Sequence, residues 1–236
     1  MDLTELLQDI AGKHGFFDQF CAAWSADYAR SGGRLHCGRG CSGCCSLTVN
    51  CTAPEALAIA RSLTPEQAAR VRALLPVIRD CAEQAANLKE WLTLYRREVG
   101  PCPLLETDGG CGIYRLRPLS CRSLLSTREP AWCVTDFSAL SSADKQAFME
   151  GLDRSAVAFP THYAATPQEV AQELELAALT AMERSCGWSL IGNLPWLVGL
   201  ALELPLNELM TQPAATARRA LEEHRTLHPF LAILSD

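Results

Sequence analysis

Apolar residues recur every three or four positions along most of the chain, the spacing that gathers them on one face of an α-helix. A first helix is predicted from Leu3 up to Ser31-Gly32-Gly33, where two glycines end it. Its apolar face consists of Leu3, Leu6, Leu7, Ile10, Phe17, Phe20, Trp24 and Tyr28. Further helical patterns cover residues 68–78, 88–95, 141–157 and 215–227. These patterns predict a mainly helical protein.

Three of the predicted helices carry a capping signal at their start. Thr52, Thr64 and Thr166 each precede a proline in the first turn, and Glu or Gln follows three residues after the threonine. A threonine at this position satisfies free amides of the first turn, and the Glu or Gln reaches back to the cap. Gly187 is expected to end the helix that starts near Thr166, because glycine readily adopts the left-handed conformation of a C-terminal cap.

The helical period disappears between Gly100 and Pro118, where glycine and proline dominate. A short β-hairpin near residues 109–114 is the one regular feature that this stretch permits. We find no internal repeat and no linker. The fold prediction is therefore a single helical domain over residues 1–236, carrying two irregular cysteine-rich loops, with the cysteine-cluster region at residues 37–122. Long loops in a compact domain are usually functional or held by a ligand.

Charge and hydropathy exclude several partners. The net charge of −6 argues against nucleic acid. The most apolar run, residues 190–206, is interrupted by Pro195, Glu203 and Pro205, so no membrane span is expected. The first twenty residues have neither a basic start nor an apolar centre, so no signal peptide is expected either. We therefore expect a cytoplasmic protein, in a compartment where structural disulfides are disfavoured.

Cysteine is the residue type that points to chemistry, because the chain has twelve and eight of them lie in residues 37–51 and 102–121. The first segment reads HCGRGCSGCCSLTVNC, and its glycines would let one loop wrap several thiolates around a centre. A disulfide knot, a metal or iron–sulfur site, a reactive thiol and simple core packing are the competing explanations. Adjacent side chains of an extended segment point in opposite directions, so Cys44 and Cys45 are not expected to serve one ion in the same way.

The cysteine segments resemble a known family. The stretch CGRGCSGCC, then CPLL, then CGIYRLRPLSCR with its Arg117-Pro118 turn, is similar to the YkgJ-type cysteine-cluster family, described as zinc- or iron-chelating. Flagellin lysine N-methylase shares this signature. The family pattern is C-x2-C-x2-CC, whereas the first gap here has three residues, so Cys37 is the least constrained position. The resemblance implies metal binding through Cys37, Cys41, Cys44, Cys45, Cys102, Cys111 and Cys121.

The number of thiols favours an iron–sulfur cluster over zinc, because one structural zinc takes four ligands. The expected function is therefore metal handling or redox by a metal-binding protein, with the cluster or ion between loops 37–51 and 102–121. A protein partner is left open. The alternative is a cluster-dependent, protein-modifying enzyme resembling lysine N-methylase, so whether the chain is an enzyme stays open.

Several neighbouring residues have simpler or supporting interpretations. Arg39, Arg115, Arg117 and Arg122 lie among the cysteines, where arginine stabilises thiolates. Arg117 and Arg122 are expected to bond thiolates or nearby carbonyl groups and to offset negative charge. A shared centre would also tie residue 45 to residue 102. Cys51 is either a peripheral ligand or the lead-in to a helix. The cysteines expected to pack in the core are Cys21, Cys81, Cys133 and Cys186.

Overall fold

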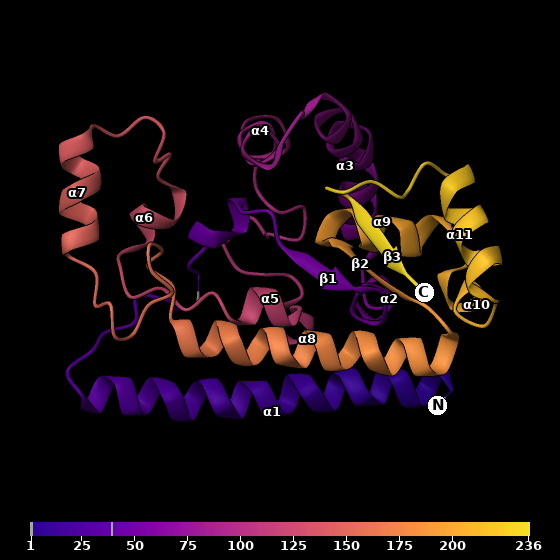
Figure 1. The fold of residues 1–236 in the computed structure, drawn as a ribbon, viewed down its shortest axis with the longest axis horizontal. Helices are drawn as coiled ribbons and strands as arrows, with labels where there is room; N and C mark the ends of the chain where they lie inside the picture. Colours follow the sequence, from indigo (N-terminus) through magenta and orange to yellow (C-terminus); the bar gives the residue numbers. More distant parts are fainter. Residues whose placement is uncertain (1, 39) are drawn as a thin grey trace.

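The computed structural model describes residues 2–38 and 40–236. Two long helices, α1 (Leu3–Arg30) and α8 (Ala165–Cys186), run antiparallel and side by side along one edge of the molecule (Figure 1). The start of α1 is fixed by a capping box, in which the Glu5 amide donates to the Asp2 carboxylate and the Asp2 amide donates to Glu5, both at 2.8 Å. None of the described helices is long and apolar enough to cross a membrane.

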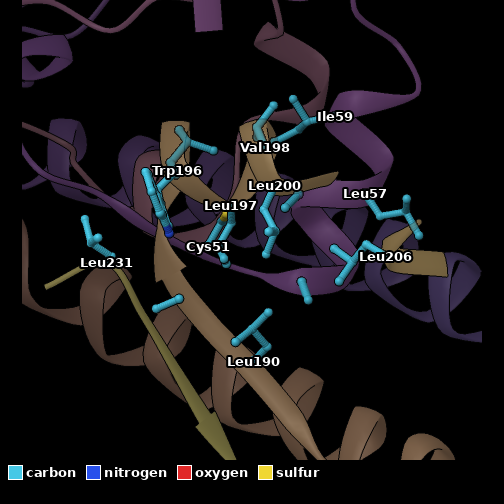
Figure 2. Close-up of a cluster of buried hydrophobic side chains, with 14 of the residues drawn as sticks. Cys51, Leu57, Ile59, Leu190, Trp196, Leu197, Val198, Leu200, Leu206 and Leu231 are labelled. Carbon is cyan, nitrogen blue, oxygen red and sulfur yellow. The ribbon is translucent and has the colours of Figure 1, made fainter. Parts of the chain in front are cut away.

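The main core lies where α2 (Ala53–Ala60), α3 (Pro65–Gln84) and α9 (Leu194–Glu203) pack beside a small sheet. Figure 2 draws this cluster, in which Trp196, Leu197 and Val198 of α9 lie near Cys51 and Leu190 of the sheet. Full burial of each large apolar side chain contributes about 1.5–3 kcal/mol, so this cluster accounts for much of the folding free energy.

The sheet has three antiparallel strands in the order β1 (Asn50–Thr52), β2 (Ser189–Asn193) and β3 (Ala232–Ser235). It joins the end of the first cysteine segment to the C-terminal part of the chain, because Cys51 in β1 pairs with Gly192 in β2. A Cβ at Gly192 would come within 2.1 Å of the Leu231 carbonyl oxygen, so the close approach of the chain requires glycine.

The remaining helices are short. In chain order they are α4 (Leu88–Leu94), α5 (Leu119–Arg122), α6 (Pro130–Val134), α7 (Ser142–Glu150), α10 (Leu206–Leu209) and α11 (Ala214–Glu223). The α6–α7 region lies at the opposite end of the molecule from α10 and α11 (Figure 1). It has its own small core, in which Phe148, Leu152 and Val157 pack against Trp132 and Phe137.

The mainly helical prediction is confirmed, with differences in detail. Capping boxes form at Thr52 and Thr64 as expected, and Gly187 ends α8 in the left-handed conformation. The predicted cap at Thr166 is wrong, because α8 already begins at Ala165, immediately after Ala164 bridges to Val157. The helix expected over residues 141–157 ends at Glu150.

The three-stranded sheet was not predicted. The hairpin expected near residues 109–114 takes the form of one antiparallel bridge between Leu105 and Cys111, closed by the turn between them. Tyr114 then begins a short 3-10 helix, Tyr114–Leu116.

Candidate metal centre

The first cysteine loop is seated on α6. Cys44 and Cys45 lie in a 3-10 helix, Gly43–Ser46, that packs closely against Pro130–Val134. A Cβ at Gly43 would stand 2.9 Å from Cys133 Cβ and 3.0 Å from the Pro130 carbonyl oxygen, so only glycine allows this contact. The extended conformation assumed from the sequence is therefore wrong here, and the Cys44 and Cys45 thiols are hydrogen-bonded to each other.

The second cysteine loop is joined directly to the first. The Cys102 amide donates a 2.8 Å hydrogen bond to the carbonyl of Cys45. Helix α3 holds the loop from the other side, because Arg70 Nε donates to the Pro103 carbonyl at 2.8 Å and its guanidinium pairs with Glu106 at 3.0 Å. The bridge from Leu105 then brings Cys111 back beside this segment.

Cys121 lies on α5, which a buried carboxylate anchors. Glu55 is fully buried, and its Oε1 accepts from the Leu119 amide at 2.9 Å and lies 2.9 Å from His14 Nε2. Its Oε2 accepts from the Thr52 amide at 2.9 Å and from the Thr52 hydroxyl at 3.0 Å. A buried carboxylate is tolerated only when its oxygens are hydrogen-bonded. Glu55 therefore ties α5 to both α1 and α2.

Two arginines shape the chain around Cys121 in different ways. Arg122 is buried, and its guanidinium pairs with Asp18 and donates from Nε to the Arg117 carbonyl at 2.6 Å and from another nitrogen to the Arg115 carbonyl. Of the two kinds of partner expected for Arg122, thiolates and carbonyl groups, the structure shows carbonyl groups. The Arg117 guanidinium lies 4.0 Å from the centre of the Tyr114 ring. Its positive charge partly opposes the rise in the pKa of Cys44, Cys111 and Cys121 that burial and other thiols cause. Arg39 lies outside the described residues.

Thiols from both loops lie close enough to affect one another's ionisation. The pKa of Cys102 is raised to about 11, chiefly by burial, and negative charge on Cys111 and Cys44 contributes to the rise. Burial raises the pKa of Cys121 well above its usual value, with smaller contributions from Cys102, Cys44 and Cys111. The pKa of Cys44 is raised by its hydrogen bond with Cys45 and then by burial. These four thiols, Cys44, Cys102, Cys111 and Cys121, form one cluster, which we call the shared thiol cluster.

Cys37 and Cys41 lie near both Cys44 and Cys133 of α6. Cys37 is exposed as a residue, but its sulfur accepts a 3.1 Å hydrogen bond from the Ser126 amide. The pKa of Cys37 is raised to about 11, chiefly by burial of the sulfur, and the neighbouring Cys44, Cys41 and Cys133 thiols contribute to the rise. The first loop therefore extends the shared thiol cluster toward residues 126–133.

Cys133 is a member of this neighbourhood that the sequence did not reveal. It is buried, as expected for a packing residue, yet its Sγ lies 3.4 Å from Nε2 of the equally buried His162. Burial raises the pKa of Cys133, hydrogen bonds with Tyr163 and Ser126 lower it, and Cys44 and Cys41 raise it. Burial also lowers the pKa of His162, which favours the neutral imidazole. No motif signals His162, because only tertiary packing brings it here.

The other cysteines lie apart from both loops or in the core. Cys51 is fully buried in β1, where it pairs with Gly192 of β2, and the chain enters α2 two residues later. Cys81 is buried in α3, while Cys21 and Cys186 are half-buried on α1 and α8 and pack against the apolar clusters. All three therefore have the packing role expected of them.

The thiols of the cluster are donors that suit a soft metal, although their sulfur atoms do not converge on a single position. Thiolates select zinc, copper(I) and iron–sulfur clusters. Within residues 2–38 and 40–236, no group of three or more His, Cys, Asp or Glu side chains is arranged to hold an ion as the side chains stand. Binding through this set therefore requires thiol rotation and local adjustment of the loops.

Comparison with known proteins agrees with this chemistry. Residues 36–142 match the family model described as "CxxCxxCC: Putative zinc- or iron-chelating domain", as the sequence motifs predict. The match includes all seven expected ligands and Cys133, and it ends before His162. No curated protein and no solved structure matches the chain.

Proposed function

We propose that residues 36–142, as a metal-chelating CxxCxxCC domain, hold an iron–sulfur cluster between loops 37–51 and 102–121 and serve in metal handling or redox. The observation that carries this proposal is the shared thiol cluster, in which Cys44 of the first loop is electrostatically coupled to Cys102, Cys111 and Cys121 of the second. Within this cluster the first loop contributes one thiol and the second loop three, so a four-ligand site built from it needs both loops.

The proposed ligands are the seven cysteines that the motifs predict, together with Cys133. They are Cys37, Cys41, Cys44, Cys45, Cys102, Cys111, Cys121 and Cys133. Without a cation these thiols favour their protonated form, because burial raises the pKa of most of them. Metal binding releases those protons, and the resulting thiolates are stabilised by the metal and by the nearby charge of Arg117. We place this chemistry in the cytoplasm, where thiols remain reduced.

The size of the ligand set favours a cluster over a single zinc ion. Zinc in a structural site takes four ligands, and the proposed set is larger. When bound, an iron–sulfur cluster supplies one-electron redox chemistry, whose potential depends on burial and on hydrogen bonds to the sulfurs. The chain's own contribution is to hold the Cys121 thiol of α5 in a buried position and to keep Arg117 near the thiols.

The alternative of a cluster-dependent protein-modifying enzyme has weaker support. Such an enzyme needs an accessible hollow beside an open coordination position. A surface hollow of about 640 Å³ lies between the end of α1 and residues 127–156, and its lining includes Trp24, Tyr28, Arg128 and Asp153. Among the residues that the structure describes, no cysteine lines this hollow, so it offers a bound molecule no direct contact with the thiols.

The test is metal and acid-labile sulfide analysis of anaerobically purified protein, with UV–visible and Mössbauer spectra. The expected result is iron with matching sulfide and the charge-transfer absorption of a cluster. A colourless protein with stoichiometric zinc and no sulfide would overturn the cluster but retain metal binding. Protein that neither retains nor takes up zinc or iron would overturn metal binding itself. Calorimetric binding of S-adenosylmethionine would favour the enzyme alternative.

A further inference from the structure

We propose that His162 supplies an imidazole nitrogen ligand to the metal centre, paired with Cys133. This inference rests on the proposed metal-binding function and concerns a residue outside both cysteine loops and outside the matched domain. His162 is only 5% exposed, and its Nε2 lies 3.4 Å from Cys133 Sγ, which is also 5% exposed. A buried imidazole facing a buried thiol therefore stands at one side of the shared thiol cluster.

The separation of these two atoms is the separation that a common metal would require. Zinc binds sulfur at about 2.3 Å and imidazole nitrogen at about 2.0–2.1 Å, so two ligands at the tetrahedral angle stand about 3.5 Å apart. The observed 3.4 Å is close to that value, so neither side chain must travel far to contact one ion. Cys44 and Cys41 are near enough to influence Cys133, which supplies further thiols on the same side.

The backbone holds the histidine in this place. Its carbonyl accepts hydrogen bonds from both the amide and the hydroxyl of Thr127, each at 3.0 Å. The preceding residue, Ser126, donates its amide to the Cys37 sulfur at 3.1 Å. Residues 126 and 127 thus fix the positions of Cys37 and His162 together, which links the imidazole to the first cysteine loop.

Aromatic contacts fix the ring as well. The imidazole lies edge-on to Phe148 with 5.9 Å between ring centres, and its centre is 4.3 Å from that of Tyr163. These two rings limit how far the imidazole can turn away from Cys133. A neutral imidazole in place of one thiolate would also make the site less negative by one charge, which eases burial of the centre.

X-ray absorption at the K edge of the bound metal tests the assignment. The purified wild-type protein, or apo-protein loaded anaerobically with zinc alone, is compared with His162→Gln and with a control, His224→Gln, whose histidine is exposed at the end of α11. We expect a nitrogen scatterer with imidazole outer-shell features in the wild type and the control, and its loss in His162→Gln. Zinc affinity in chelator competition should fall by about 10-fold or more in that variant alone.

Two results would overturn the inference while leaving the proposed function intact. One is a wild-type spectrum that requires sulfur only, which needs no variant and does not depend on the folding of His162→Gln. The other is an imidazole signal that persists in His162→Gln. Failure of the wild type to bind zinc or iron would overturn both proposals. Circular dichroism and melting of the chelated variants separate loss of a ligand from loss of the fold.

Discussion

The Cys102 amide donates a 2.8 Å hydrogen bond to the Cys45 carbonyl, although α2, α3 and α4 lie between them in the sequence. This bond joins the two cysteine loops at the two residues that a shared centre would tie together. The backbone therefore brings the loops together independently of side-chain ligation, and the thiols of both loops face one neighbourhood.

The shared thiol cluster predicts that single ligand substitutions have global effects. Cys44→Ser and Cys121→Ser should each lower metal content and the midpoint of thermal unfolding together, because each removes a ligand that both loops share. Metal analysis and differential scanning calorimetry of the same samples provide the measurement. Cys186→Ser, at the far end of α8, is the matched control and should retain the wild-type metal content. Loss of metal from one loop with a full complement in the other would contradict a shared centre.

Gly43 predicts a second, purely steric effect. Gly43→Ala places a methyl group 2.9 Å from Cys133 Cβ and 3.0 Å from the Pro130 carbonyl, so the Gly43–Ser46 turn must move off α6. We expect a destabilisation of about 1–3 kcal/mol and weaker metal binding, measured by urea unfolding and chelator competition. Gly38→Ala is the control, because a Cβ at Gly38 meets nothing within 4 Å. Equal behaviour of the two variants would show that the contact with α6 does not position the thiols.

The sequence predicted the parts of this protein that local patterns specify. The capping boxes at Thr52 and Thr64 formed because Glu55 and Gln67 lie within reach in the first turn. The sheet escaped prediction because its strands are only three to five residues long and pair across the whole chain. The cap predicted at Thr166 was wrong because Ala164 is held in a bridge with Val157 and α8 begins at the next residue, Ala165.

The same division holds for the candidate site. Clustered cysteines in glycine-rich loops were visible as a pattern, and the family match agrees with them. The neighbourhood of Cys133 was not visible, because α6 and the segment at His162 are brought together by the tertiary structure, through the contact of Cys133 with His162 and the bonds of Thr127 to His162. A cysteine in a short apolar stretch and a lone histidine carry no spacing signal of their own.

Glu55 predicts how strongly α5 depends on its buried anchor. In Glu55→Gln the side-chain amide must face either the Leu119 amide or the Thr52 amide, and each of these is already a donor. Loss of one buried acceptor should cost about 2–4 kcal/mol in the free energy of unfolding, measured by urea titration. Glu222→Gln, on the exposed face of α11, is the control and should change stability by less than about 0.5 kcal/mol. A wild-type unfolding curve for Glu55→Gln would contradict the anchoring role.

Glu175 predicts how stability depends on pH. Burial raises the pKa of this carboxyl group on α8 from 4.5 to about 7, and the Ser120 hydroxyl that bonds it opposes the shift. Between pH 4.5 and 7 the folded state holds a proton that the unfolded state has released, so the contribution of Glu175 to stability falls as pH rises through this window. Above pH 7 the folded protein keeps a buried carboxylate at a cost in stability that Glu175→Gln removes.

We therefore expect Glu175→Gln to raise the free energy of unfolding at pH 8 by about 1–3 kcal/mol and to flatten its decline between pH 4.5 and 7. Urea unfolding of the chelated protein at a series of pH values measures this without interference from metal binding. Glu173→Gln, on the exposed side of the same helix, is the control, and equal pH profiles for the two variants would contradict the assignment.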